Sequence, residues 1–450
     1  MKKYSFLLLP FLFLFYSFYP IDGYDRTGMR RLLYWNLVEN ETLKGRTPKA
    51  GAYKKLDEIQ LHLADLPRYD SLGSLPPVDE ELQAELTKLF PYRANYSMTL
   101  LQLTPDGEPR YAAHKEEREY QPGSVGKLAV LTAIFCELQN MFPDDFEKRA
   151  KLLKDRMVTG REFAVYDHHT IPVFNAQDST FRKRRANQKD VFSLYEWIDH
   201  MVSVSNNGAA SVVWREALLM REFQKDYLEL TEDEADEYFK NADRRELAEF
   251  GQSIVNDPLR EHGIQRDEWR LGTMFTRGAS GIVPPKGGST GTPKGLMKWM
   301  LMLEMGDMID PWSSLEMKRL IYLTDRRIRY ASNKGLDSTA VYYKSGSLYK
   351  CNRDKDPNCK KYAGNVYNYM NSVAIVERPD SVAYMTCLMT NVLQRNSAWD
   401  HNRLAGQVDD LFPQNILASD TVKVIKSQRV EMSEEEVVAV EGEDADNEEE

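Results

Sequence analysis

A chain of 450 residues is long enough for one large domain or two of ordinary size, and its 42% hydrophobic and 28% charged content is that of a globular protein. The formal net charge is -10, but residues Glu431–Glu450 hold 11 acidic and no basic side chains, so the rest of the chain is nearly neutral. A nearly neutral body gives no electrostatic reason to expect nucleic-acid binding, and the acidic end is typical of a disordered tail.

The N-terminus begins with Lys2 and Lys3 and continues with a run of uncharged residues, Phe6–Tyr19. This pattern predicts a secretory leader within residues 1–24, because the run is shorter than the roughly 20 apolar residues of a spanning helix. No A-x-A cleavage site follows, and the uncharged run can be extended to Tyr4–Ile21, so an uncleaved anchor stays open. We expect export to the periplasm or cell envelope, with attachment to the inner membrane if the leader is retained.

The amino-acid pattern after the leader changes near residue 95. Residues 25–94 are mostly polar without a site motif, which favours a membrane-proximal segment. Residues 95–119 alternate apolar and polar side chains on both sides of Pro105-Asp106-Gly107, and this pattern predicts a β-hairpin. A helix is predicted to begin at Ser124, at the start of a strongly apolar run.

The middle of the chain is predicted to be mostly helical. Helical spacing extends over 143–265 with a break near 166–190, and the charge-rich part at 218–262 is typical of an exposed helical insertion. Another helix is predicted after a loop rich in Gly, Pro, Ser and Thr, with Thr292 as N-cap and Pro293 in the first position.

Strand patterns return from Thr339, in three apolar runs. Two strands, a helical block and three strands predict an α+β fold, in which one antiparallel sheet of about five strands is flanked by the helical block. The folded domain is expected to span 95–412, and 413–450 to form a C-terminal extension that ends in the disordered acidic tail.

The four cysteines fall into two groups. Cys136 and Cys387 lie in apolar runs and are predicted to be small core residues. Cys351 and Cys359 flank a polar segment, and in an exported protein such a pair can close a loop through a disulfide. Sequence alone leaves open whether this disulfide forms.

The stretch QPGSVGKLAVL places Ser124 three residues before Lys127. A capping serine at a helix start is the ordinary interpretation of Ser124. A serine hydroxyl needs a base within hydrogen-bond reach to become a nucleophile, and a lysine that burial keeps neutral can be that base. Ser-x-x-Lys is a weak signal alone, but here it follows a predicted hairpin and opens an apolar helix.

Two further motifs follow in the chain. Ser205 and Asn207, in VSVSNNGAAS, offer a hydroxyl that can relay a proton and an amide that can bind a substrate carbonyl and the lysine. By itself, this stretch is an ordinary helix start.

The third motif lies in AVYYKSGSLYK on a predicted strand. Lys344 offers a fixed positive charge for a substrate carboxylate, although a lysine between aromatic residues is usually an exposed strand position. The small Ser345 and Gly346 let a substrate lie against the strand edge. The backbone N–H groups of Ser347 and Ser124 can together form an oxyanion hole.

These three motifs, in this order, resemble those of the penicillin-interacting serine enzymes, which comprise the class A β-lactamases and the D,D-peptidases that bind penicillin. The similarity covers roughly residues 95–412, and it implies a β-lactamase/transpeptidase-like fold. It further implies an acyl-enzyme mechanism without cofactors, acting on a small-molecule or peptide substrate with a free carboxylate. The implied roles are nucleophile for Ser124, general base for Lys127, proton relay and substrate contact for Ser205 and Asn207, and carboxylate anchor for Lys344.

The sequence departs from the class A β-lactamases at the position of their deacylating glutamate. That position falls at 274–276, and no Asp or Glu occurs anywhere from Leu271 to Leu303. Asn206 also stands where those enzymes usually have aspartate. Because an unassisted water attacks an acyl-enzyme slowly, the sequence favours a D,D-peptidase-like hydrolase. A β-lactamase with another deacylation route and a non-catalytic envelope binding protein on the same fold remain alternatives.

No metal site is predicted. His168 and His169 are adjacent, and neighbouring side chains point apart on most backbones, with no further ligand cluster in the sequence. The glycine-rich stretch KGGSTGTPKG does not match a phosphate-binding loop.

Overall fold

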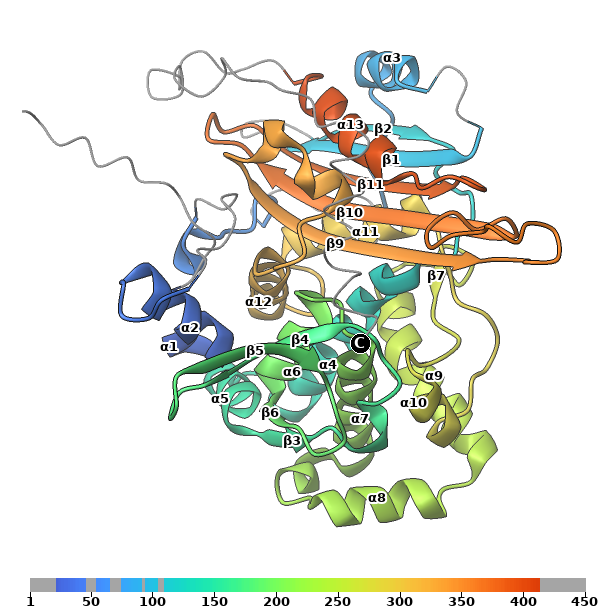
Figure 1. Ribbon diagram of the computed structural model, residues 1–450. Coiled ribbons are helices and arrows are strands. Elements are labelled where there is room, and N and C mark those ends of the chain that lie inside the picture. Colours follow the sequence, from blue (N-terminus) through green and yellow to red (C-terminus); the bar gives the residue numbers. More distant parts are fainter. Residues whose placement is uncertain (1–21, 46–53, 65–73, 91–93, 104–108, 413–450) are drawn as a thin grey trace, which may run out of the picture.

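The computed structural model describes residues 22–45, 54–64, 74–90, 94–103 and 109–412 of the chain. Its centre is a five-stranded antiparallel sheet with the strand order β2–β1–β11–β10–β9 (Figure 1). The predicted sheet of about five strands in an α+β fold is therefore confirmed. The strands are β1 Tyr96–Leu103, β2 Arg110–His114, β9 Ala340–Lys350, β10 Tyr367–Glu377 and β11 Ala383–Asn391.

The register of the sheet places β9 at one edge, where Gly346 lies opposite Asn371 of β10. In β10 the side chains alternate between two cores: Val373 and Ile375 belong to the large core, and Ala374 and Val376 to a second core on the other face. A strand that is buried on both faces has a continuous run of apolar residues. This is why β9, β10 and β11 could be predicted from the sequence.

Helices cover both faces of the sheet (Figure 1). Helices α3 (Glu80–Lys88) and α13 (Ala398–Asp409) pack on one face through Leu86 and Leu404. Helices α11 (Pro293–Met305) and α12 (Pro311–Tyr322) lie on the other face, next to the helical block. Helix α11 begins as predicted, with the Thr292 hydroxyl accepting a hydrogen bond from Gly295 N and proline in the first turn.

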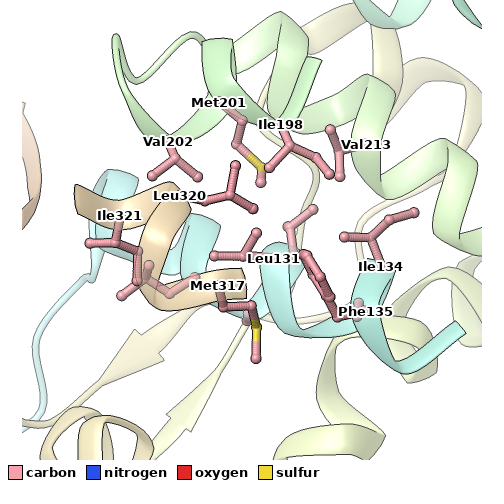
Figure 2. Close-up of a cluster of buried hydrophobic side chains, with 14 of the residues drawn as sticks. Leu131, Ile134, Phe135, Ile198, Met201, Val202, Val213, Met317, Leu320 and Ile321 are labelled. Carbon is pink, nitrogen blue, oxygen red and sulfur yellow. The ribbon is translucent and has the colours of Figure 1, made fainter. Parts of the chain in front are cut away.

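The core of the helical block is built around α4 (Lys127–Met141). Figure 2 shows Leu131 and Phe135 of α4 among apolar side chains of α6 (Leu194–Val202), α7 (Asn207–Phe223) and α12. All of these side chains are at most a few per cent exposed. Because α4 is buried on nearly every side, its first residue, Lys127, lies inside the protein.

The remaining elements are short strands and peripheral helices. They are α1 Tyr24–Thr27, α2 Arg30–Glu39, α5 Phe146–Asp155, β3 Met157–Thr159, β4 Thr170–Asn175, β5 Thr180–Arg185, β6 Val191–Ser193, α8 Glu232–Asn241, α9 Arg244–Glu261, β7 Trp269–Arg270, α10 Arg277–Ile282 and β8 Thr290–Gly291.

The helix predicted to begin at Ser124 begins at Lys127 instead. Gly123 has a positive φ of 52°, and residues Gly123–Gly126 form a tight 3₁₀ turn in which Val125 N donates to Pro122 O. This turn places the Ser124 side chain before the α-helix rather than in its first turn.

The region 143–265 holds more strand than the sequence indicates. Strands β4 and β5 pair as a hairpin, which fills the predicted break, and β3 pairs with β6. The segment 218–262 is not wholly an exposed insertion, because α9 buries Leu247, Ile254 and Leu259 in the large core. Only α8, with a single buried residue, fits the expected exposed helix.

The described part of 25–94 is not a separate polar segment. Met29, Leu32, Leu56, Ile59 and Leu63 are buried in the large core, so this part of the chain packs onto the domain. Residues 1–21 of the leader predicted within residues 1–24, the turn at 105–107 and the extension at 413–450 lie outside the described residues. Among the helices that are described, none has both the length and the apolar character needed to cross a bilayer.

The cysteines divide as the sequence suggests. Cys351 and Cys359 form a disulfide with a Cα–Cα distance of 5.8 Å, in the connection between β9 and β10. Cys136 and Cys387 are free and buried.

Candidate active site

The turn before α4 brings Ser124 and Lys127 into direct contact. Lys127 Nζ lies 3.1 Å from Ser124 Oγ, so the two residues predicted to be nucleophile and base are in hydrogen-bond contact. Ser124 is half-buried at the wall of a cavity, whereas Lys127 is fully buried. The hydroxyl can therefore reach a substrate while the amine is kept from bulk water.

The pKa of Lys127 is lowered to about 7, mainly by burial. The Asp167 carboxylate opposes this shift, and the Arg326 guanidinium adds to it. A lysine normally titrates near 10.4, so this environment leaves a large neutral fraction at neutral pH. The neutral amine has the lone pair that a general base requires.

Ser205 links the first motif to the third. Lys127 Nζ lies 3.3 Å from Ser205 Oγ and also bonds the Ser205 carbonyl, and Lys344 Nζ lies 2.8 Å from the same Oγ. Ser205 has a positive φ of 64°, a conformation that costs a non-glycine residue about 1–3 kcal/mol. The backbone thus holds this hydroxyl between two amines, where it can pass a proton from one group to another.

The surroundings of Lys344 disfavour the fixed positive charge that the sequence predicts for it. Burial, followed by the nearby Lys127, Arg326 and Arg329, lowers the pKa of Lys344 well below its usual value. Four basic groups converge here, so the region favours an anion. A bound carboxylate would restore the charge of Lys344, because an opposite charge raises a lysine pKa.

Gly346 and Ser347 form the contact between β9 and the nucleophile turn. A Cβ on Gly346 would lie 2.3 Å from Pro122 O and 3.0 Å from Ser124 N, so only glycine fits. A Cβ on Gly123 would lie 2.8 Å from Ser347 N. The backbone nitrogens of Ser124 and Ser347, the predicted oxyanion hole, thus lie on two segments that pack directly together. The buried Ser345 comes just before Gly346 on β9.

Asn207 is placed differently from the prediction. Its backbone N–H donates to Asp167 Oδ2 at 2.5 Å, and its side-chain Nδ2 donates to Asp167 Oδ1 at 3.0 Å. An ionised carboxylate only accepts, so the amide nitrogen must face Asp167. That nitrogen is therefore not aimed at Lys127, although Asn207 does line the same cavity as Ser124.

Asp167 and His169 are site residues that the sequence analysis missed. His169 Nδ1 lies 2.8 Å from Asp167 Oδ1, and Asn206, the N-cap of α7, donates to the His169 carbonyl. Burial raises the pKa of Asp167, but His169, Lys127 and the Asn207 N–H together hold it well below its usual range. The adjacent histidines were expected to point apart, yet the rings of His168 and His169 stack with centroids 4.5 Å apart.

The stretch 274–276, where the sequence places the missing loop glutamate, contains the aromatic residue Phe275. Phe275 lines the cavity, and its ring centroid lies 5.3 Å from Lys127 Nζ. The nearest carboxylates in sequence are engaged elsewhere: Glu268 pairs with Lys298, and Glu304 is buried against Lys318.

Ser124, His169, Asn207 and Phe275 line one cavity of about 360 Å³, a size that suits a small ligand. The residues lining it include Gly123, Ser124, His168, His169, Asn207, Leu271, Thr273, Met274, Phe275, Ser289, Ser347, Leu348, Tyr349, Lys361 and Tyr362. Tyr349 and Tyr362, with ring centroids 5.9 Å apart, come from the strand and loop on either side of the disulfide and add an aromatic wall. No sequence signal pointed to this wall.

Within the described part of the chain, two groups of side chains have the spacing of metal ligands. In the first, the candidate ligand atoms of Asp167, His168 and His169 lie within 4.8 Å of one another. The Asp167 oxygens already accept from Asn207 and His169, so hydrogen bonds account for this group. The second comprises His62, Glu304 and Glu377, whose carboxylates are paired with the buried Lys318.

Comparison with known proteins agrees with this geometry. Residues 78–408 match the model of the beta-lactamase enzyme family. The chain belongs to this family. The β-lactamase-like fold of a serine hydrolase is thus established for a protein of this family, whereas its D,D-peptidase or β-lactamase activity is a separate question.

Several solved structures resemble this family member in fold. A structure of PBP-A is 14% identical over 75% of this chain and 97% of that chain, with a TM-score of 0.46. Class A beta-lactamase of Bacteroides cellulosilyticus is 12% identical over 74% and 97%, with a TM-score of 0.48. A beta-lactamase of Chitinophaga pinensis is 12% identical over 74% and 99%, also with a TM-score of 0.48. No curated protein sequence matches the chain significantly.

Proposed function

We propose that this protein is an exported serine hydrolase of the D,D-peptidase-like type, which forms an acyl-enzyme at Ser124. The observation that carries the proposal is the contact of Lys127 Nζ with Ser124 Oγ at 3.1 Å, made by an amine whose pKa is lowered to about 7. A base with a pKa near the working pH is the most effective one.

The acylation step follows from these contacts. Lys127 Nζ takes the proton of Ser124 Oγ as the oxygen attacks the substrate carbonyl carbon. The carbonyl oxygen becomes an oxyanion, to which the N–H groups of Ser124 and Ser347 donate. The C–N bond then breaks, and the proton passes from Lys127 through the Ser205 hydroxyl to the leaving amine. The products are the Ser124 ester, a free amine and a neutral Lys127.

The substrate is proposed to be a peptide or amide with a free carboxylate on the leaving side. Lys344, Arg326 and Arg329 repel one another's charge, as the lowered pKa of Lys344 reflects. A carboxylate relieves this repulsion, so its binding is favoured where the three cations converge.

A peptidase-like rather than a β-lactamase activity is supported by the loop between the second and third motifs. Phe275 lies where a class A enzyme would offer a carboxylate to the deacylating water. In a β-lactam the leaving amine stays attached to the acyl group, so it continues to occupy the site after acylation. We therefore expect a long-lived adduct with β-lactams.

Export is supported by the leader-like N-terminus and by the Cys351–Cys359 disulfide, because disulfides persist in oxidising compartments. Fractionation of the source cells tests this proposal. A chain found in the cytosol with its leader intact would contradict it.

The proposed chemistry is tested with a chromogenic cephalosporin, by following absorbance and the intact protein mass together. We expect a stable mass increase that maps to Ser124, with little turnover. Ser124→Ala should remove the adduct entirely. Ser253→Ala in α9, a serine outside the cavity lining, is the matched control and should label like the unchanged protein.

Each other outcome has a definite meaning. Rapid turnover without a trapped adduct would make the protein a β-lactamase. An adduct on Ser124→Ala, or no adduct and no turnover in the unchanged protein, would contradict the acyl-enzyme proposal.

A further inference from the structure

The acylation mechanism does not use the hydrogen-bonded side chains of Asp167 and His169. Asp167 and His169 lie between α5 and α7, in the segment that leads into β4, and His169 lines the same cavity as Ser124. Their hydrogen bonds tie them to Asn206 and Asn207 of the second motif. The site also lacks a carboxylate in the 271–303 loop, so the group that completes turnover must come from elsewhere.

We propose that His169, oriented by Asp167, is the general base that activates the water or amine which attacks the Ser124 acyl-enzyme. This inference rests on the proposed acyl-enzyme and adds the residue that resolves it. A carboxylate paired with a histidine is a common way to make a general base, because the carboxylate fixes the imidazole and stabilises it when it takes up a proton.

The hydrogen bonds determine the tautomer of His169. Its Nδ1 lies 2.8 Å from Asp167 Oδ1 and 3.5 Å from Asn207 Nδ2, which is itself a donor. The shorter contact is to an acceptor that stays ionised, so Nδ1 carries the proton. Nε2 then holds the free lone pair, and it makes no hydrogen bond to any residue of the described chain.

The surroundings of His169 keep its ring neutral. Its pKa is lowered to about 4, mainly by burial; Asp167 opposes this shift, and Arg326 and Lys127 add to it. The imidazole is therefore an acceptor over the whole physiological range. Lys127, by contrast, already contacts Ser124 Oγ and both oxygens of Ser205, so it is placed to move the protons of the acylation step.

The step balances without any further reactant. A water oxygen attacks the acyl carbonyl carbon, and one of its protons passes to His169 Nε2. The tetrahedral oxyanion collapses, the bond between the carbonyl carbon and Ser124 Oγ breaks, and Oγ recovers the proton from His169. The products are a carboxylic acid and the free enzyme. An amine in place of water gives an amide by the same proton transfers.

The test uses an acyl thioester with a carboxylate on its thiol part, because the thiol leaves the site after acylation. Thiol release gives the turnover rate, and the intact mass gives the acylated fraction. His169→Gln should slow turnover roughly 10²–10⁴-fold, which is the usual contribution of a general base, and should accumulate protein acylated at Ser124. Accumulation of an adduct requires a folded active site, so a misfolded variant cannot imitate this result.

His262→Gln is the matched control, because His262 caps the end of α9 and does not line the cavity. It should turn over without an adduct. Asp167→Asn removes the carboxylate that positions His169 and should also accumulate the adduct. In the unchanged protein, the acylation rate should fall below pH 7 with Lys127, whereas the deacylation rate should hold until about pH 4.

Two outcomes would overturn the inference in different ways. If the unchanged protein turns the thioester over and His169→Gln does so equally fast without an adduct, His169 is not the base and Lys127 serves both steps. If neither protein forms an adduct or releases thiol, the acyl-enzyme proposal itself fails, and this inference fails with it.

Discussion

Three buried lysines of this protein show how surroundings decide what a side chain does. Burial alone lowers the pKa of all three. Lys318 is surrounded by Glu304 and Glu377, whose charges outweigh burial and raise its pKa. Lys344 has cationic neighbours, and the one carboxylate near Lys127, Asp167, does not outweigh burial, so both of these pKa values are lowered. Lys318 therefore stays charged and has a structural role, whereas Lys127 and Lys344 can exchange protons.

The lowered pKa of Lys127 predicts the pH dependence of acylation. The neutral amine is the base, so the acylation rate should rise with pH through about 7 and level off above it. Lys127→Arg cannot supply a neutral base and should acylate roughly 10²–10⁴-fold more slowly. Adduct formation with a cephalosporin, timed by intact mass between pH 5 and 9, measures both effects.

Lys151→Arg in α5 is the control for this substitution, because Lys151 is exposed on the surface. It should keep the full profile. An acylation rate that stays flat from pH 5 to 9 in the unchanged protein would show that Lys127 is not the titrating base.

At the residue scale the sequence predicts the site wherever a short motif carries the chemistry. Ser124, Lys127, Ser205 and Lys344 form a connected set of contacts, as the three motifs indicate. Asp167 and His169 were missed because their partners, Asn206 and Asn207, lie about 40 residues away in the chain. A contact of that kind exists only once α7 is folded against the loop before β4.

At the scale of helices and strands, the pattern of apolar residues predicts those elements whose burial requires that pattern. The strands β9, β10 and β11 are long apolar runs with two buried faces, and α11 has a complete cap. The hairpin β4–β5 was missed because β5 is mostly charged and exposed. It is held by aromatic contacts with α2, such as the Tyr34 and Phe181 rings at 3.9 Å, which no local pattern reveals.

The contact of β9 with the nucleophile turn gives the next prediction. A Cβ on Gly346 would lie 2.3 Å from Pro122 O, which Asn371 of β10 already holds through a 3.0 Å hydrogen bond. Gly346→Ala must therefore push β9 and the turn apart. A displacement of about 1 Å at a catalytic group costs roughly 10²-fold in rate, so we expect a loss of that size in the acylation rate constant.

Gly288→Ala is the control, since a Cβ on Gly288 would meet nothing within 4 Å. Its acylation rate should be unchanged. Wild-type acylation by Gly346→Ala would mean that the two segments do not need to touch in the working enzyme.

At the scale of the whole molecule, a buried charge cluster joins the N-terminal part of the chain to the domain. Lys318 Nζ of α12 lies 2.6 Å from Glu304 of α11, 2.8 Å from Glu377 of β10 and 2.6 Å from the Gln60 carbonyl. His62 N also donates to Glu304 at 2.9 Å. The segment 54–64 lies outside the region matched by the family model, yet the cluster fixes it to the core.

Removing the central cation of this cluster should destabilise the whole protein. Lys318→Met leaves Glu304 and Glu377 buried without their main counter-charge, and breaking a buried ion pair in this way costs about 3–5 kcal/mol of unfolding free energy. Urea unfolding at pH 7.5 measures the loss. Lys148→Met removes an exposed pair with Asp145 and should change stability by less than about 1 kcal/mol.

The pH dependence of this loss separates the charge effect from a packing effect. In the unchanged protein Lys318 and His62 outweigh burial and hold the pKa of Glu304 at about 2, so its contribution to stability is present above the unfolded-state value and is lost only as the pH falls toward 2. In Lys318→Met, burial is no longer outweighed, so the carboxyl pKa values rise and the folded state takes up protons more readily than the unfolded state. The stability difference between the two proteins should therefore be largest at pH 7.5 and clearly smaller at pH 5. An equal difference at both values would assign the loss to the missing side-chain volume, and the segment 54–64 would then be held by its apolar contacts alone.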